Sequence, residues 1–225
     1  MTYNIIVGRN EDDRKKFGDQ GTIFLGKHYI KMGQFTSLSN PVYLDVNTSH
    51  IVLVSGKRGG GKSYSISSIA EEMTRLPEEV ANNLAILMFD TMGIFWTMKY
   101  PNTAQEKQLQ AWNLKPEGMQ VTIYVPEGKF KDYQQKGIPV DKPFSIKTAE
   151  LTAQDWCNVF TINQNDDKGV LISRILKELP TDYSIQDIIN HIKKDARATT
   201  PIKDAVEGLF ETATTWGLFS ATGNN

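Results

Sequence analysis

The residues best suited to chemistry form one short glycine-rich segment. Residues 56–63 read GKRGGGKS, a full match to the pattern G-x-x-x-x-G-K-[ST]. Glycines let the backbone curl until its amide groups point at a phosphate, and the helix that follows presents its positive end to the same anion. The segment therefore predicts a phosphate-binding loop that holds a nucleotide.

Each residue type in this loop has an expected role. Lys62 is expected to contact the β- and γ-phosphates and to stabilise charge on the transferred phosphoryl group, and the Ser63 hydroxyl is expected to bind Mg²⁺. Arg58 either touches a phosphate or faces solvent. The alternative is a glycine-rich turn beside an incidental Lys-Ser pair, but an apolar segment before the loop and an amphipathic one after it favour the binding loop. The predicted nucleotide-binding residues are Gly56, Arg58, Gly59, Gly60, Gly61, Lys62, Ser63 and Tyr64, with Ser63 as metal ligand.

Asp90 is the one local candidate for a second catalytic residue beside Lys62. It follows the apolar segment 84–89, where a carboxylate could hold Mg²⁺ through water as a Walker B aspartate does. It could equally cap the turn that follows. Residues 90–93 also match D-x-x-G, a GTPase signature, but the chain has no N-K-x-D motif to read guanine. Both roles of Asp90 stay open.

The elements around the loop read as an α/β core. Three apolar segments, 51–54, 84–89 and 121–125, are separated by stretches with helical character, which predicts a parallel sheet covered on both faces. The helix after the loop is expected to stop before Pro77, and a weaker helix is expected within 103–112.

The two ends of the chain differ from this core. Residues 1–46 contain short β segments between turns, namely 3–7, 22–25, 28–32 and 42–46. The last third is helical, with capping boxes at 152–155 and 184–187 and a helix start at Thr200-Pro201. We therefore predict an α/β fold with three parts: a small barrel-like β unit (1–46), a partial P-loop core (47–148) and a helical subdomain (149–225).

Composition narrows the class of protein. The 225 residues include 25 Lys and Arg against 26 Asp and Glu, so a net charge of -1 offers no long-range attraction to nucleic acid, and any DNA contact has to be local. The one cysteine, Cys157, suits a reducing compartment. No signal peptide or membrane span is visible, so we expect a cytoplasmic protein without a membrane partner.

The sequence resembles a known family in its motifs. The string GKRGGGKSY, the apolar segment after it, the string DTMGIFW at 90–96 and the helical segment beyond are similar to the HerA/FtsK group of hexameric RecA-like ATPases, and within it to archaeal HerA-type DNA translocases. The resemblance implies a RecA-like P-loop NTPase core that uses ATP and Mg²⁺, a homo-oligomeric ring, double-stranded DNA and a nuclease as partners, and ATP hydrolysis that drives movement along DNA in end processing or repair.

Three departures from the family pattern shape what we expect. The first 45 or so residues are short for the family's barrel, Ile94 stands where many members have an acidic residue, and the family's Walker B strand with its Asp-Glu pair would follow the helical segment. We therefore expect a truncated or shortened relative that hydrolyses ATP slowly on its own. Two alternatives stay open: a stand-alone P-loop GTPase or kinase, and a non-hydrolysing nucleotide-binding assembly module.

Overall fold

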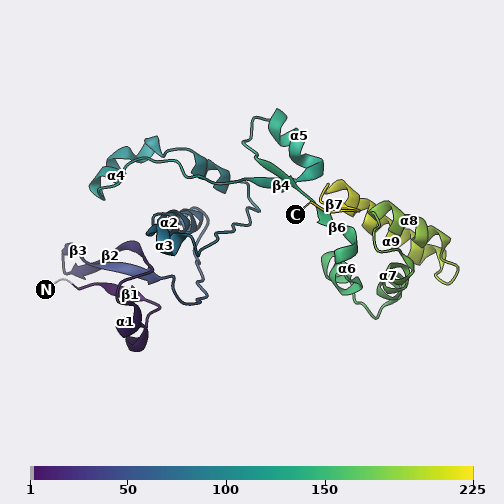
Figure 1. Cartoon of the computed structure of the whole chain (residues 1–225), viewed down its shortest axis with the longest axis horizontal. Helices are drawn as coiled ribbons and strands as arrows, with labels where there is room; N and C mark the ends of the chain where they lie inside the picture. Colours follow the sequence, from purple (N-terminus) through teal and green to yellow (C-terminus); the bar gives the residue numbers. More distant parts are fainter. Residues whose placement is uncertain (1–2, 225) are drawn as a thin grey trace. The chain divides into compact units, whose positions relative to one another are not determined.

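The computed structural model describes residues 3–224, and their fold is mixed α/β (Figure 1). The chain divides into two compact units, Met1–Gln120 and Val121–Asn225. The boundary between these units falls inside the predicted core of residues 47–148. The phosphate-binding loop lies in the first unit and the predicted helical subdomain in the second.

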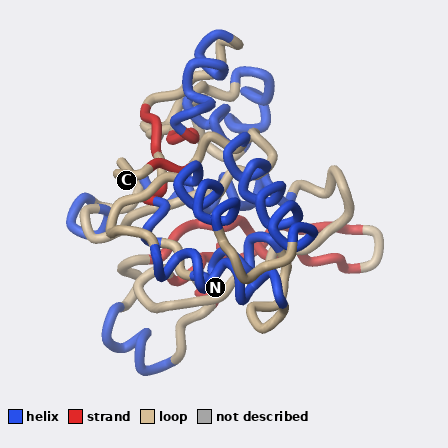
Figure 2. Tube along the Cα trace, turned by 90° about the vertical axis from the view of Figure 1, so that its right-hand side faces the viewer, coloured by secondary structure: helices blue, strands red, loops and turns tan. Residues whose placement is uncertain are grey.

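The first unit begins with a three-stranded sheet in the order β1-β3-β2. The strand β1 (Ile5–Val7) pairs parallel to β3 (Phe35–Asp45), and β2 (Thr22–Met32) pairs antiparallel to β3. Two β segments predicted separately therefore form the single strand β2, whose pairing has register shifts near Gly26. In Figure 2 strands are red, and β2 and β3 form the longest pair. Within the described residues this sheet is open rather than closed into a barrel.

A helix that the sequence analysis did not predict lies between β1 and β2. The helix α1 spans Glu11–Phe17 and is capped by the side chain of Asn10, which accepts a hydrogen bond from the Asp13 amide at 2.8 Å. Three acidic residues occupy its first turn and three basic residues its last turn, an arrangement that favours a helix through its dipole.

The helix predicted after the phosphate-binding loop is present. The helix α2 spans Lys62–Thr74 and ends before Pro77, with the short α3 (Glu78–Ala81) following. The weaker helix predicted within 103–112 is also present, as the 3-10 helix η2 (Thr103–Gln105) continued by α4 (Glu106–Ala111). Another 3-10 helix, η1, spans Phe95–Lys99.

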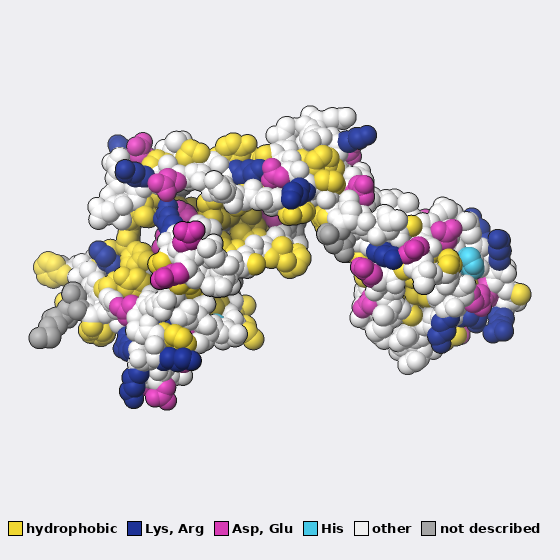
Figure 3. Space-filling model, viewed as in Figure 1, with side chains coloured by type: hydrophobic (Ala, Val, Ile, Leu, Met, Phe, Trp, Pro, Cys, Tyr) yellow, Lys and Arg dark blue, Asp and Glu magenta, His cyan; other side chains and the backbone are white. Residues whose placement is uncertain are grey.

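The predicted parallel sheet of the P-loop core is not formed among the described residues. The segments 51–54 and 84–89 are not strands, and of 121–125 only the end belongs to a strand, β4 (Tyr124–Pro126). Apolar runs alone suggested these strands, but a strand also needs a hydrogen-bonded neighbour. Ile51, Leu53 and Phe89 are exposed instead, and Figure 3 shows yellow apolar side chains gathered on the visible face of this unit.

The second unit contains two small parallel strand pairs. The strand β4 pairs with β5 (Lys142–Phe144), and β6 (Ile146–Lys147) pairs with β7 (Phe219–Ser220). The helix α5 (Glu127–Gln135) follows β4 directly. Glu127 lies in the first turn of α5, where a negative charge stabilises a helix through its dipole.

Four helices complete the second unit and confirm the predicted helical segment. After the 3-10 helix η3 (Thr148–Glu150), both predicted capping boxes are present: Thr152 with Asp155, and Ser184 with Asp187. The helices are α6 (Ala153–Phe160), α7 (Asp167–Glu178), α8 (Ile185–Lys194) and α9 (Thr200–Thr215).

These four helices enclose the largest apolar core of the described residues. The Trp156 ring lies 5.0 Å from the Phe210 ring and 4.9 Å from the Phe219 ring, and Trp156 and Phe210 are fully buried. At one edge of this core the Arg174 guanidinium donates two hydrogen bonds to the Asp195 carboxylate, at 2.8 and 2.9 Å. Burying each large side chain contributes about 1.5–3 kcal/mol.

Candidate nucleotide-binding site

The phosphate-binding loop has the backbone geometry that its glycines predict. Gly59 and Gly61 have φ angles of +76° and +81°, in the left-handed region where a side chain is strained. A Cβ on Gly60 would lie 3.0 Å from the Lys57 carbonyl oxygen, to which the Gly60 amide also donates a hydrogen bond. The curl of the loop therefore depends on glycine at these positions.

Lys62 is the first residue of α2, and its side chain turns back over the loop. Its ammonium group donates hydrogen bonds to the carbonyl oxygens of Gly56 at 2.9 Å and Lys57 at 2.8 Å. Ser63 follows within the first turn of α2 and is half-buried, whereas Arg58 is exposed in the loop. A positive charge, a hydroxyl and the amino end of a helix are thus grouped at one place.

This donor set fits a nucleotide polyphosphate and a magnesium ion. Phosphate oxygens accept from ammonium and amide groups, and a hydroxyl oxygen is a ligand type that Mg²⁺ uses beside phosphates and water. The left-handed glycines provide the concave backbone that such anions occupy. The residues that would hold the polyphosphate and the magnesium ion are therefore Lys62, Ser63 and the loop glycines.

The segment leading into the loop is fixed by a buried carboxylate. Asp45, at the end of β3, accepts hydrogen bonds from Arg9, Thr48 and His50, the last at 3.0 Å. Burial alone would raise the pKa of Asp45, but these hydrogen bonds outweigh it and hold the pKa below its ordinary value. The His50 ring also packs against Gly8, where a Cβ would lie 2.9 Å from the ring. The sheet of this unit therefore anchors the chain six residues before Gly56.

Asp90 lies at the end of its apolar segment and caps the turn that follows. One carboxylate oxygen accepts from the Ile94 amide at 3.0 Å, and the other accepts from the Phe95 amide at 2.7 Å. Of the two roles that the sequence left open, the turn cap is the one seen in the structure. A catalytic role for Asp90 stays a prediction.

A cavity on the flank of α2 brings in residues that the sequence analysis did not assign to the site. It has a volume of about 450 Å³ and is lined by Tyr64 and Glu71 of α2, by Trp96 and Tyr100, and by Lys115 among others. Only Tyr64 was predicted as a site residue. The aromatic run after Asp90 was the available signal for Trp96, but sequence spacing could not show that this run folds back beside α2.

The described residues contain neither a clustered set of metal ligands nor a membrane-spanning helix. No cluster of three or more His, Cys, Asp or Glu side chains that could hold a metal ion occurs in the part of the chain that the structure describes. Among residues 3–224, no helix is both long enough and apolar enough to cross a membrane.

Comparison with protein families gives a clear match. Residues 30–215 match the family model described as the central domain of helicase HerA, which covers most of the chain and includes the phosphate-binding loop and α2 to α9. The chain belongs to the HerA family. The HerA match confirms the resemblance noted in the sequence and supports a P-loop ATPase that uses nucleotide and Mg²⁺. No curated protein and no solved structure matches the chain.

Proposed function

We propose that this chain is the nucleotide-binding part of a HerA-like DNA-translocating ATPase, which couples ATP hydrolysis to movement along duplex DNA in end processing or repair. The observation that carries the proposal is the complete phosphate-binding loop, residues 56–63, curled at the amino end of α2 within the HerA family match. A RecA-like core is part of the proposal.

The described residues support binding and charge stabilisation. When bound, ATP with Mg²⁺ supplies the transferable phosphoryl group and a metal that spreads its charge. Lys62 exchanges the carbonyl oxygens of Gly56 and Lys57 for phosphate oxygens, and so places a positive charge beside the transferred group. Ser63 offers its hydroxyl to Mg²⁺, and the loop amides orient the phosphates.

Asp90 is proposed as the second catalytic residue. Its two oxygens are held by the Ile94 and Phe95 amides, so the carboxylate is fixed in orientation. A fixed carboxylate can orient a water molecule or a hydrated Mg²⁺ without further ordering. Because its hydrogen-bonding capacity is partly used by the turn, we expect slow hydrolysis by this chain.

The assembly and partners are proposed from the family. HerA membership favours a homo-oligomeric ring, and we propose duplex DNA and a nuclease as its partners, in the cytoplasm. A net charge of -1 gives a single chain little attraction for DNA, whereas a ring repeats each local contact and raises its effective concentration. DNA binding is therefore expected to depend on assembly.

Steady-state phosphate release tests this proposal. We expect turnover of ATP well below the roughly 1 to 100 per second typical of kinases, an increase on adding duplex DNA, and loss of activity in Lys62→Ala. Asp90→Asn should have a lower rate than the wild type. Lys131→Ala, which removes an exposed lysine of α5, should have the wild-type rate. A rate that duplex DNA does not alter would contradict translocation, and a preference for GTP would favour a stand-alone GTPase.

A further inference from the structure

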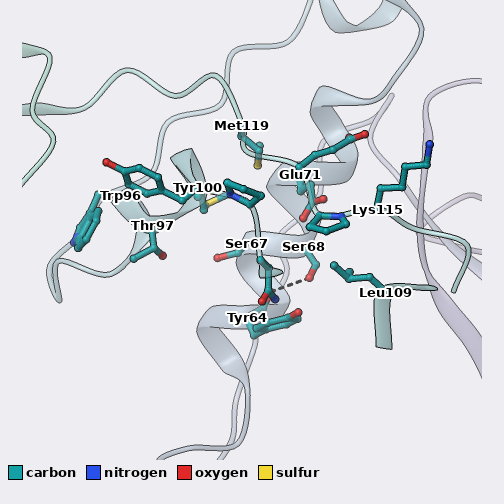
Figure 4. A pocket seen from close by; sticks show the side chains of 15 residues that line it. Tyr64, Ser67, Ser68, Glu71, Trp96, Thr97, Tyr100, Leu109, Lys115 and Met119 are labelled. Atoms are coloured by element: carbon teal, nitrogen blue, oxygen red, sulfur yellow. Dashed lines mark hydrogen bonds between the residues drawn. The ribbon is translucent and has the colours of Figure 1, made fainter. Parts of the chain in front are cut away.

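The cavity beside α2 has the size and lining of a site for a flat heterocycle. Its volume of about 450 Å³ lies within the range of small-molecule sites, which is roughly 300–1,000 Å³. Tyr64, Trp96 and Tyr100 contribute aromatic rings, and the hydroxyl groups of Ser67 and Ser68 and the amide of Asn102 contribute polar edges. In Figure 4 the α2 side chains lie along the cavity, with Trp96, Thr97 and Tyr100 together on one side and Leu109 and Lys115 on the other.

The aromatic side chains of this cavity are held in place by hydrogen bonds and by ring packing. The Trp96 indole donates to the Gly93 carbonyl oxygen at 2.9 Å, and the Tyr100 ring packs edge-on against Trp96 at 6.2 Å. The Tyr64 hydroxyl donates to Gln105 Oε1 at 3.1 Å. The site is therefore ordered before any ligand arrives, which reduces the entropy cost of binding.

Two chain segments opposite α2 are packed tightly against each other, and this packing keeps the cavity open. The Met119 amide donates to the Met98 carbonyl oxygen at 2.8 Å. A Cβ on Gly118 would lie 2.3 Å from the Lys99 carbonyl oxygen, so glycine is required for this approach. These contacts fix the segment that carries Met119 against the segment that carries Trp96 and Tyr100.

Two carboxylates that line the cavity are paired with one arginine. Arg75 pairs with Glu71 at 2.6 Å and with Glu117 at 3.6 Å, which both line the cavity, and also with Glu72 at 2.9 Å. Lys115 adds a positive charge to the lining. Arg75 and Lys115 therefore offset part of the negative charge that these carboxylates present to a ligand attached to a polyphosphate.

The lining of the cavity includes Tyr64, the residue that directly follows the phosphate-binding loop. Tyr64 is the residue after Ser63 and lies about 3 Å along the helix axis from Lys62. We propose that this cavity holds the purine base of the nucleotide, with the base against the rings of Tyr64, Trp96 and Tyr100. This inference rests on the proposed nucleotide site at residues 56–63.

Binding of ATP with Mg²⁺, compared with inorganic tripolyphosphate with Mg²⁺, tests the proposal because tripolyphosphate lacks the base. We expect Tyr64→Ala and Tyr100→Ala each to weaken ATP binding by about tenfold or more, which is the usual effect of losing one aromatic ring against a base. Tripolyphosphate binding should be unchanged in both variants, which also shows that they are folded. Tyr64→Phe keeps the ring but loses the hydrogen bond to Gln105, so it should weaken ATP binding much less than Tyr64→Ala does. Tyr29→Ala, which removes an exposed ring of the β2–β3 hairpin, should bind ATP like the wild type.

The fluorescence of Trp96 provides a second measurement. ATP should change the emission of the protein, tripolyphosphate should not, and Trp96→Phe should remove the change. Undiminished ATP binding in Tyr64→Ala and Tyr100→Ala would overturn the base site while leaving the phosphate-binding loop intact. Equal losses for ATP and tripolyphosphate would also overturn it, because the substitutions would then act on phosphate binding and not on the base. A wild-type protein that binds neither compound would instead overturn the nucleotide site itself.

Discussion

Replacing Asp195 with asparagine removes the negative charge of the buried ion pair that joins α7 to the end of α8. The Asp195 carboxylate accepts two hydrogen bonds from Arg174 and one each from the Arg197 and Ala198 amides, at 2.9 and 2.7 Å. The hydrogen bonds from Arg174, helped by these amides, lower the pKa of Asp195 from 3.8 to about 2. Asparagine keeps the shape of the side chain but not its charge.

The size of the effect follows from the two pKa values. A difference of roughly 1.8 between the folded and unfolded states corresponds to about 2.4 kcal/mol. Arg174 is 21% exposed, so solvent screens part of this interaction, and we expect about 1–2 kcal/mol. Because the folded pKa is depressed, this contribution is fully present above the unfolded pKa of 3.8 and is lost as the pH falls through about 2.

Urea unfolding followed by far-ultraviolet circular dichroism between pH 7 and pH 2 measures this contribution. We expect Asp195→Asn to lower the free energy of unfolding by about 1–2 kcal/mol at pH 7, and the difference from the wild type to shrink as the pH falls below 4. Asp182→Asn, which alters an exposed pair with Lys147, is the matched control and should have little effect. A difference of the same size at pH 7 and at pH 2 would refute the charge argument and point to lost hydrogen bonds alone.

Three further predictions concern the core, two glycines and DNA. Phe210→Ala should leave a cavity beside Trp156 and lower the free energy of unfolding by about 3–5 kcal/mol; a loss below 1 kcal/mol in denaturant unfolding would mean that this core repacks. Gly208→Ala, in α9 with open space around its position, should stabilise the protein by about 0.5–1 kcal/mol. Gly128→Ala should destabilise it, because a Cβ there would lie 2.7 Å from Gly217 Cα. Thermal unfolding should therefore show a raised melting temperature for Gly208→Ala and a lowered one for Gly128→Ala. Duplex DNA binding by the monomer, followed by fluorescence anisotropy, should be weak and should fall steeply between 50 and 200 mM salt, and tight binding by a monomer at 200 mM salt would count against this.

Elements defined by local signals could be predicted from the sequence. The capping boxes at Thr152 and Ser184 gave the starts of α6 and α8, and the glycine-rich loop with Pro77 bounded α2. In each case, the residues that set the element lie within a few positions of it. The phosphate-binding residues could be predicted for the same reason.

Elements that depend on distant partners could not be predicted in this way. The apolar segments 51–54 and 84–89 have the composition of strands, but whether they pair depends on neighbouring strands that the segments themselves do not encode. The cavity beside α2 depends on the approach of Gly118 to Lys99, which no local pattern shows. The cap that Asn10 forms on α1 is a local signal. The helix was nevertheless not predicted, because its acidic and basic residues show no apolar periodicity.

The central claim, that the loop at residues 56–63 binds ATP with Mg²⁺, is tested most directly by thermal unfolding with and without this ligand. A ligand that binds only the folded state at 100 times its Kd stabilises the protein by about 2.7 kcal/mol, so the melting temperature should rise by several degrees. Lys62→Ala should lose most of this rise, because its ammonium group is the charge that the loop presents to the phosphates. Lys131→Ala should keep the full rise. A melting temperature that saturating ATP and Mg²⁺ do not change, or a rise that Lys62→Ala leaves intact, would contradict the claim.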